Sequence, residues 1–179
     1  MSLKGNKGFS LLEVLVVVVI LSVLAATLIP RFGSSIEKSK ISRAETELKT
    51  FKTALTKVFF DTNYFPKDVS ANQDPGLTLK TRVPRAHQKN WDGPYLERWP
   101  KNGHPWGGSY DYEYGRNTAM NFDGTAGNEV TLVMRDGALT QKILDRIDAD
   151  LDDGNASTGL VRHNRRNRLE YFVGEGPKW

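Results

Sequence analysis

The spacing of apolar residues changes along this chain. Residues 9–29 form an apolar run of 21 residues that contains one charged side chain, Glu13. As an α-helix this run would be about 32 Å long, close to the hydrocarbon thickness of a bilayer. The pattern therefore predicts a transmembrane helix over residues 9–29.

From residue 30 onward the apolar residues become periodic. They recur every three or four residues, as on one face of an amphipathic helix. The stripe comprises Ile41, Ala44, Leu48, Phe51, Leu55 and Val58. We expect the helix to continue over residues 30–61, with this stripe packed on a sheet. Because proline removes a backbone donor, Pro30 together with Gly33 predicts a bend or a melted turn at the junction.

The remaining residues, 62–179, are predicted to form one globular domain. Residues 67–108 contain five prolines and little regular spacing, which indicates a long structured loop. A turn at residues 75–79 is expected to lead into one short helical piece. Alternating residues then predict four strands. These are residues 110–114, 130–134, 159–162 and 168–173, the last two joined by a turn at residues 163–167.

A second helix is predicted between the second and third strands. Its apolar residues are Leu139, Ile143, Leu144, Ile147 and Leu151. Its polar side is expected to hold Asp145, Asp148 and Asp152. Together these elements predict an α+β fold, in which one long N-terminal helix packs on a small antiparallel sheet, with a short C-terminal helix and a hairpin.

Glu13 is the most unusual residue of the apolar run. A carboxylate at the middle of a membrane helix costs roughly 2.5 to 3.5 kcal/mol, and an acid in such a place usually has a function. Cleavage between Gly8 and Phe9 would create an α-amino group at the same end of the helix. The amine of a neighbouring subunit, shifted along the helix axis, could then pair with Glu13. Glu13 would then fix the axial register between neighbouring subunits during assembly.

Two simpler interpretations of the N-terminal segment remain. A secretory signal peptide has a shorter apolar stretch and a cleavage site of small residues, which this run lacks. A plain membrane anchor explains the length of the run and the flanking Lys4 and Lys7, but not Glu13.

Residues 7–14, Lys-Gly-Phe-Ser-Leu-Leu-Glu-Val, resemble the cleavage and methylation motif of the type IV pilin and pseudopilin superfamily. The resemblance implies that residues 1–8 are a leader peptide, which a prepilin peptidase removes after Gly8. It also implies N-methylation of Phe9 and a contact from Glu13 to the amino terminus of a neighbouring subunit. Pro30 matches the family position at which the helix melts in assembled filaments.

Further landmarks resemble the major pseudopilin of type II secretion systems. In order, they are residues 63–66, 76–77, 90–96, 100–101 and 105–107. The resemblance implies a pilin-like fold and a structural, homo-oligomeric helical filament that drives protein export across the outer membrane. The implied partners are minor pseudopilins, an inner-membrane assembly platform and the prepilin peptidase, which is also the methylase. The extra C-terminal helix departs from the family pattern.

Two other functions are weighed against a secretion subunit. A type IV pilin would build fibres for adhesion, motility or DNA uptake, but such pilins commonly close their C-terminal loop with a disulfide, and this chain has no cysteine. A membrane-tethered binding domain would need no filament, and would still work without Glu13.

Charge predicts the orientation of the chain. Lys4 and Lys7 precede the apolar run and should stay cytoplasmic, which places the C-terminal domain in the periplasm. Before assembly the subunit is then a single-pass inner-membrane protein in contact with lipid, and afterwards part of a periplasmic pseudopilus. The formal net charge of +4 falls to +2 without these two lysines, so no nucleic-acid partner is expected.

Acidic residues near position 150 are candidate metal ligands. The candidates are Asp148, Asp150, Asp152, Asp153 and Asn155. Ca²⁺ prefers several such oxygens, although Asp153 stands where an EF-hand loop requires glycine. The resemblance to major pseudopilins also implies calcium in the C-terminal region, while no other cofactor is expected to be required. The alternative is a solvated helix end.

Four arginines lie close together in the C-terminal part of the chain, and the sequence shows no catalytic pattern. The arginines are Arg162, Arg165, Arg166 and Arg168, and salt bridges between subunits are their simplest use. A nucleic-acid interface would need interleaved aromatic residues, which the segment lacks. With no cysteine and three scattered histidines, the sequence predicts no enzyme activity.

Overall fold

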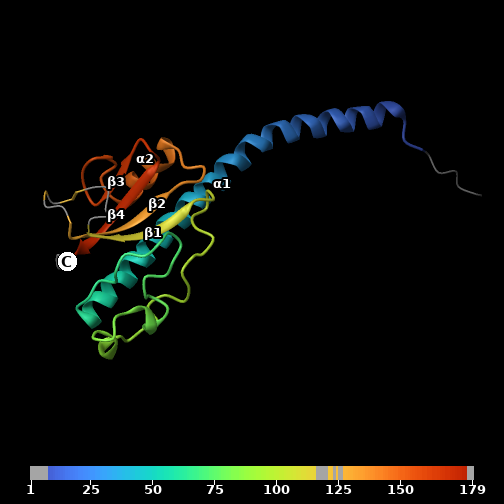
Figure 1. The fold of residues 1–179 in the computed structure, drawn as a ribbon. Coiled ribbons are helices and arrows are strands. Elements are labelled where there is room, and N and C mark those ends of the chain that lie inside the picture. Colours follow the sequence, from blue (N-terminus) through green and yellow to red (C-terminus); the bar gives the residue numbers. More distant parts are fainter. Residues whose placement is uncertain (1–7, 116–120, 123, 125–126, 177–179) are drawn as a thin grey trace, which may run out of the picture. The chain divides into compact units, whose positions relative to one another are not determined.

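The computed structural model describes residues 8–115, 121–122, 124 and 127–176, and only the helical backbone of residues 27–32. The chain divides into two compact units, Met1–Ser39 and Lys40–Trp179, and each is described by itself. Figure 1 labels the helices and strands. In chain order the main elements are α1 (Leu11–Thr62), β1 (Ser109–Tyr114), β2 (Glu129–Arg135), α2 (Gln141–Leu151), β3 (Val161–Asn164) and β4 (Arg168–Glu175).

The first unit consists of the start of α1 and the residues before it. α1 extends without interruption from Leu11 to Thr62, so its backbone is helical at Pro30. Melting at Pro30 in an assembled filament stays a prediction. All side chains from Leu11 to Ala26 are exposed. Within the part of the chain that the structure describes, no helix is both long and apolar enough to cross a membrane.

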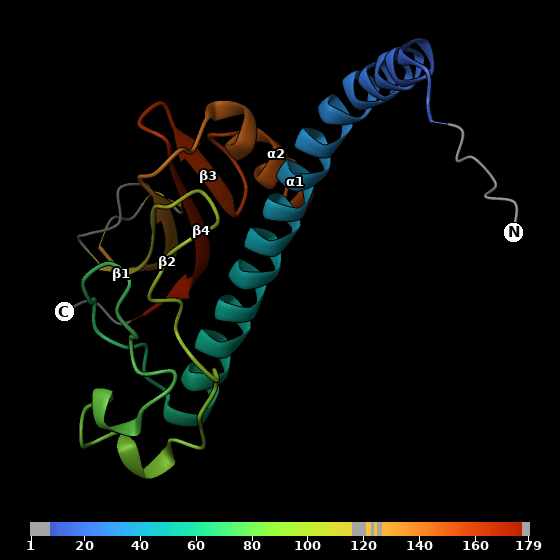
Figure 2. The same cartoon turned by 90° about the vertical axis from the view of Figure 1, so that its right-hand side faces the viewer.

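The second unit is built on a four-stranded antiparallel sheet with the order β1-β2-β4-β3. Tyr112 of β1 pairs with Leu132 of β2, which in turn pairs with Tyr171 of β4. Val161 of β3 pairs with the other side of Tyr171. The C-terminal part of α1 lies along one face of this sheet (Figure 2). This confirms the predicted α+β architecture.

The core lies between α1 and the sheet. Ala44, Leu48, Phe51, Leu55 and Val58 are buried, as the stripe predicted, and Ile41 is partly buried. Their partners from the sheet include Tyr110, Tyr112, Leu132, Met134 and Leu169. The rings of Phe51 and Tyr110 meet edge to face with centroids 5.2 Å apart. Since each buried large side chain contributes about 1.5–3 kcal/mol, this interface holds the unit together.

The long loop after α1 is ordered by local contacts. Asn63 ends the helix with a positive φ of 51°, a conformation that asparagine tolerates. Two short 3₁₀ helices, Lys80–Arg82 and Gln88–Asn90, replace the single predicted helical piece. The Asp74 carboxylate accepts backbone hydrogen bonds from residues 76–78, which forms the predicted turn. Trp99 and Trp106 are buried and anchor the end of the loop.

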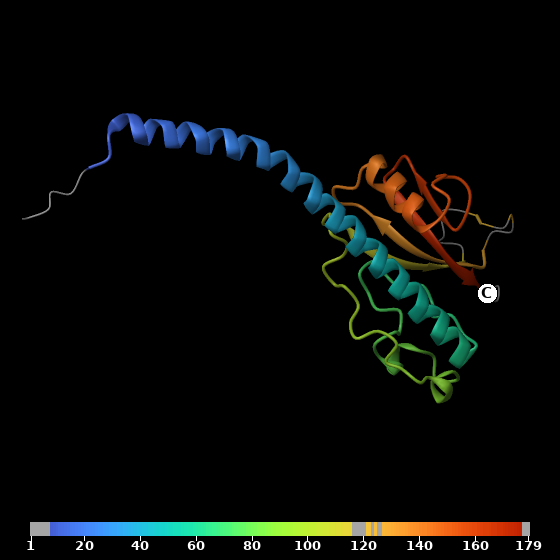
Figure 3. The same cartoon turned by 180° about the vertical axis from the view of Figure 1, so that it is seen from behind.

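The C-terminal elements differ from prediction in their boundaries. α2 matches the predicted helix except at Leu139, which lies before the N-cap Thr140. The Thr140 hydroxyl accepts a hydrogen bond from the backbone of Ile143. β3 begins two residues later than predicted and includes His163, because the Asp152 carboxylate binds the backbone N–H groups of Leu160 and Val161. Figure 3 shows α2 beside this strand from behind.

Candidate functional site

The start of α1 is a capping box formed by Ser10 and Glu13. The backbone N–H and the hydroxyl of Ser10 donate to Glu13 Oε2 at 2.8 and 2.9 Å. The Glu13 N–H donates to the Ser10 hydroxyl at 3.2 Å. These contacts satisfy N–H groups that a helix start leaves unpaired. The sequence analysis missed this partner of Glu13, although a serine three residues before a glutamate is the standard signal for it.

The predicted cleavage site lies just before this cap. Gly8 and Phe9 are exposed and precede the first helical residue, and Phe9 is 86% exposed. A side chain at Gly8 would meet no atom within 4 Å. The Gly8–Phe9 bond is therefore accessible to a peptidase in this structure. Cleavage there would place the new amine on the residue next to Ser10.

Three of the predicted metal ligands converge at the C-terminal end of α2. One carboxylate oxygen from each of Asp148, Asp152 and Asp153 lies within 4.8 Å of the others. Two oxygens bound to one Ca²⁺ at about 2.4 Å are at most about 4.8 Å apart. The carboxylates are thus close enough to share a calcium ion, and we call Asp148, Asp152 and Asp153 the acidic cluster.

Asp148 is buried, which corrects its predicted place on the polar side of α2. It follows Leu144 by four residues and Ile147 by one, so it lies on the same buried face. The side chain is fully buried, and among the described residues neither oxygen has a hydrogen bond of good geometry, although the backbone N–H of Gly154 lies near enough to lower the Asp148 pKa. Burial raises the pKa of Asp148, while the nearby His163 lowers it. A buried carboxylate in this state favours a cationic partner.

The other two members of the acidic cluster organise the loop after α2. Asp152 Oδ2 accepts hydrogen bonds from the backbone of Leu160 and Val161. Asp153 accepts one from the Thr158 hydroxyl at 2.7 Å, and this bond contributes most to lowering the Asp153 pKa. Gly159 has a φ of +69°, and a side chain there would meet Asp152 Oδ2 at 1.9 Å. Glycine therefore lets the loop close over the carboxylates.

The remaining two candidates point elsewhere. Asp150 accepts a hydrogen bond from Arg146 Nε at 2.6 Å, one turn away on α2. Asn155 Oδ1 accepts bonds from the backbone and hydroxyl of Ser157, at 3.2 and 2.9 Å. Neither belongs to the acidic cluster, and their part in metal binding stays a prediction.

His163 is a residue of this site that the sequence analysis missed. Its side chain is 2% exposed, and Nε2 lies 3.6 Å from Asp148 Oδ2 and 3.4 Å from Asp145 Oδ1. The prediction placed it in a turn, whereas it belongs to β3 and lies on the same buried face as Val161. The alternation of residues 161–164 carries that signal once the strand is given its correct start.

The predicted dense arginine patch is divided by the fold. The Arg162 guanidinium lies 4.6 Å from the centre of the Phe122 ring and donates to the Asn121 carbonyl. Arg168 binds two glutamates of the sheet. Arg165 and Arg166 are exposed at the turn between β3 and β4. Two of the four arginines are therefore held by contacts within the chain, and the use of the exposed pair in salt bridges between subunits stays a prediction.

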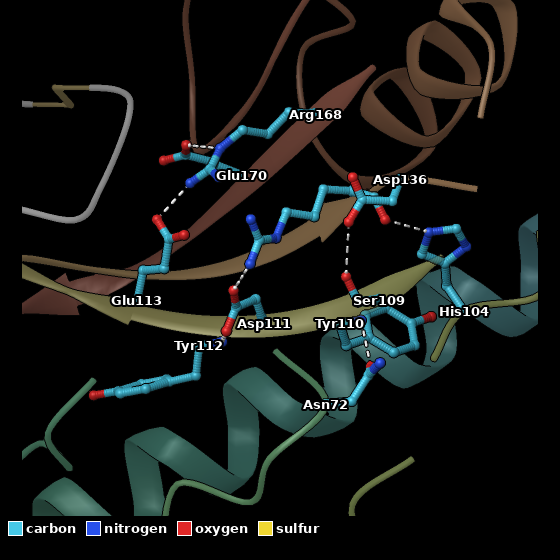
Figure 4. Close-up of polar contacts among 11 residues, drawn as sticks. Asn72, His104, Ser109, Tyr110, Asp111, Tyr112, Glu113, Asp136, Arg168 and Glu170 are labelled. Atoms are coloured by element: carbon cyan, nitrogen blue, oxygen red, sulfur yellow. Dashed lines mark hydrogen bonds and ion pairs between the residues drawn. The ribbon is translucent and has the colours of Figure 1, made fainter. Parts of the chain in front are cut away.

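Ion pairs cross the sheet on the face opposite α1, as Figure 4 shows. Arg135 donates to Asp111 at 2.7 Å, and Arg168 donates to Glu113 and Glu170. Burial raises the pKa of Asp111 and Glu113, and the neighbouring arginines oppose that shift. These pairs join β1, β2 and β4 and form no concentrated catalytic or metal-binding group.

Comparison with known proteins identifies the family. A family model described as "Prokaryotic N-terminal methylation motif" matches residues 3–29, and one described as "PilW, C-terminal" matches residues 35–125. The type II secretion system core protein G of Vibrio cholerae is 35% identical over 112 residues, which are 62% of this chain and 72% of that relative. The chain belongs to the type II secretion system core protein G family.

Other core protein G relatives give the same result. The Pseudomonas aeruginosa protein is 34% identical over 114 residues, or 63% of this chain and 76% of the relative. The Aeromonas hydrophila protein is 30% identical over 135 residues, or 72% and 92%. No solved structure gives a significant match. The resemblance inferred from the N-terminal motif and the loop landmarks is confirmed at the level of the core protein G family.

Proposed function

We propose that this chain is a structural subunit of a type II secretion pseudopilus, which polymerises through its N-terminal helix and drives protein export across the outer membrane. The observation that carries the proposal is the exposed apolar surface of α1. Every side chain from Leu11 to Ala26 is exposed, although almost all are apolar. Such a surface needs lipid or other protein to cover it. Membership of the core protein G family supplies the type of assembly.

The proposed path begins in the inner membrane. Residues 9–29 span the bilayer, Lys4 and Lys7 stay on the cytoplasmic side, and the second unit is periplasmic. The prepilin peptidase cuts after Gly8 and methylates the Phe9 amine. An inner-membrane assembly platform then transfers the subunit into a filament together with minor pseudopilins. The role is structural rather than catalytic.

Glu13 connects this path to the geometry at the start of α1. In the free subunit its carboxylate binds Ser10. During assembly the carboxylate exchanges this contact for the Phe9 amine of a neighbouring subunit. The Ser10 contact has one charged partner, whereas the ammonium and the carboxylate attract each other as opposite charges, most strongly where water is excluded. The exchange therefore favours one axial register between helices.

We also propose that the acidic cluster holds a calcium ion. Asp148, Asp152 and Asp153 would be the side-chain ligands. The ion would supply positive charge that neutralises their mutual repulsion and would fix the loop between α2 and β3. The chain has no cysteine, so no disulfide can take over that task. Three convergent carboxylates, one of them buried without a hydrogen bond of good geometry, support this site.

The filament proposal is tested with Glu13→Ala in cells that lack the native subunit. Ser22→Ala is the matched control, because it removes a polar side chain from the same apolar helix and leaves the charge unchanged. We expect Glu13→Ala to be cleaved normally but to give no sheared filaments and no secretion of exoproteins. Normal secretion by this variant would support a membrane-tethered binding domain instead. Loss of twitching rather than secretion in the deletion strain would support a type IV pilin.

A further inference from the structure

We infer that His163 is a positioning residue for Asp148 in the calcium site, an inference that rests on the calcium proposal above. His163 comes from β3 and Asp148 from α2, so the pair joins two elements. Both residues lie in the C-terminal region, where this chain departs from the family pattern. The evidence is the burial and the spacing of the two side chains.

Both side chains are buried, and both lack ordinary partners. Asp148 is fully buried and the His163 side chain is 2% exposed. Among the described residues, no hydrogen bond of good geometry reaches either ring nitrogen of His163 or either oxygen of Asp148, and the Gly154 backbone N–H lies nearest to the carboxylate as a weaker donor. Each group would be costly to bury alone. Their closest approach, 3.6 Å from Nε2 to Oδ2, is roughly half an ångström longer than an N–H···O hydrogen bond.

The His163 ring faces the Asp148 carboxylate at 3.6 Å, which is within ion-pair distance, although the two groups form no hydrogen bond in this structure. When the ring donates its Nε2–H to one carboxylate oxygen, the other oxygen stays available to a cation. Asp145 lies on the solvent side of the same nitrogen at 3.4 Å, and its side chain is 66% exposed. It can keep the ring oriented but is not needed for the ion. Outer-shell partners of this kind typically contribute 10–100-fold to metal affinity.

β3 supports a second ligand of the acidic cluster as well. The backbone N–H of Val161 donates to Asp152 Oδ2 at 3.0 Å, two residues before His163. One short strand therefore contacts two of the three carboxylates, once through its backbone and once through a side chain. Binding of the ion would be transmitted to the hairpin of β3 and β4 through these two contacts.

The test measures calcium affinity by titration calorimetry on the mature full-length chain in detergent micelles. His163→Leu removes the ring donor and should weaken calcium binding 10–100-fold. His163→Gln restores an N–H donor and should stay within about threefold of wild type. Asp150→Asn is the matched control, because Asp150 lies on the same helix but pairs with Arg146 outside the acidic cluster, and it should leave the affinity unchanged, while Asp148→Asn should abolish binding.

The possible results distinguish a failure of the His163 role from a failure of the calcium site or of the filament function. If wild type binds no calcium, the calcium site and the role of His163 both fail, while the filament function is unaffected. If wild type binds and His163→Leu binds equally well, only the positioning role fails. If His163→Leu does not fold, the ring signals of His163 in wild type decide by NMR: they should shift on calcium addition and stay unchanged in Asp148→Asn. An unshifted ring would overturn the inference.

Discussion

Ser10 and Glu13 are joined by hydrogen bonds in both directions across the first turn of α1. The backbone N–H and the hydroxyl of Ser10 both donate to the Glu13 carboxylate, and the backbone N–H of Glu13 donates to the Ser10 hydroxyl. Glu13 therefore has a partner within its own chain before a neighbouring subunit is present. In the proposed assembly, Glu13 exchanges this local partner for the amine of another subunit.

Substitution of Ser10 separates the two roles of Glu13. Ser10→Ala removes the helix cap, at a cost of about 1 kcal/mol, but leaves the carboxylate free to meet a neighbouring amine. We expect filaments to form at a reduced level, whereas Glu13→Ala forms none. Immunoblots of sheared filaments from the two variants give the comparison. Equal and complete loss in both would mean that the Ser10 contact is itself required for assembly.

Arg168 is the cation shared by two buried glutamates. It donates to Glu113 and Glu170, and their side chains are 9% and 0% exposed. Arg168→Ala leaves both carboxylates without this cation, and breaking such buried pairs costs about 3–5 kcal/mol. Urea unfolding of the mature protein should show a loss of that order. The control Arg166→Ala, at the exposed turn, should change the free energy of unfolding by less than about 0.5 kcal/mol. Equal unfolding midpoints for the two variants would refute the assignment.

The pH dependence of stability follows from Glu113. Burial raises its pKa above the usual 4.5, so the folded state keeps the proton longer than the unfolded state does. The Glu113 contribution to stability is therefore greatest below pH 4.5 and decreases as the pH rises through the raised pKa. Between these pH values, Glu113→Gln should lose less stability than wild type. The check is urea unfolding at a series of pH values, and parallel curves would contradict the expectation.

Removal of calcium should destabilise the wild-type chain. At a concentration 100 times its Kd, a bound ion contributes about 2.7 kcal/mol. We expect a chelator to lower the melting temperature of wild type and of Asp150→Asn, because Asp150 pairs with Arg146 outside the acidic cluster. Asp148→Asn should not respond to the chelator. A wild-type melting temperature that is insensitive to calcium and chelator would exclude the site.

The parts of the fold that could be predicted are those with a sustained period. The stripe from Ile41 to Val58 is set by helical spacing over five turns, and four alternating segments gave the strands. The predicted boundaries of strands and helices were less accurate where a side-chain hydrogen bond sets the boundary. Asp152 fixes the start of β3 through two backbone hydrogen bonds, and no local propensity reveals a contact across eight residues.

The residues of the candidate site were predicted only in part, because contacts between distant residues also decide them. Asp148 was placed on the polar side because it is charged, but its position four residues after Leu144 puts it on the buried face. His163 was missed because the predicted strand ended at residue 162, two residues before the end of β3, so that His163 was assigned to the turn. The Ser10–Glu13 capping box was visible in the sequence, but the predicted terminal amine offered Glu13 a different partner.

Cryo-electron microscopy of filaments sheared from cells that produce this chain tests the proposed assembly most directly. We predict a helical core of α1 segments, in which Glu13 of one subunit lies within hydrogen-bond distance of the N-methylated Phe9 amine of another and no longer contacts Ser10. Filaments in which Glu13 keeps its Ser10 partner, or subunits that retain Met1, would contradict it.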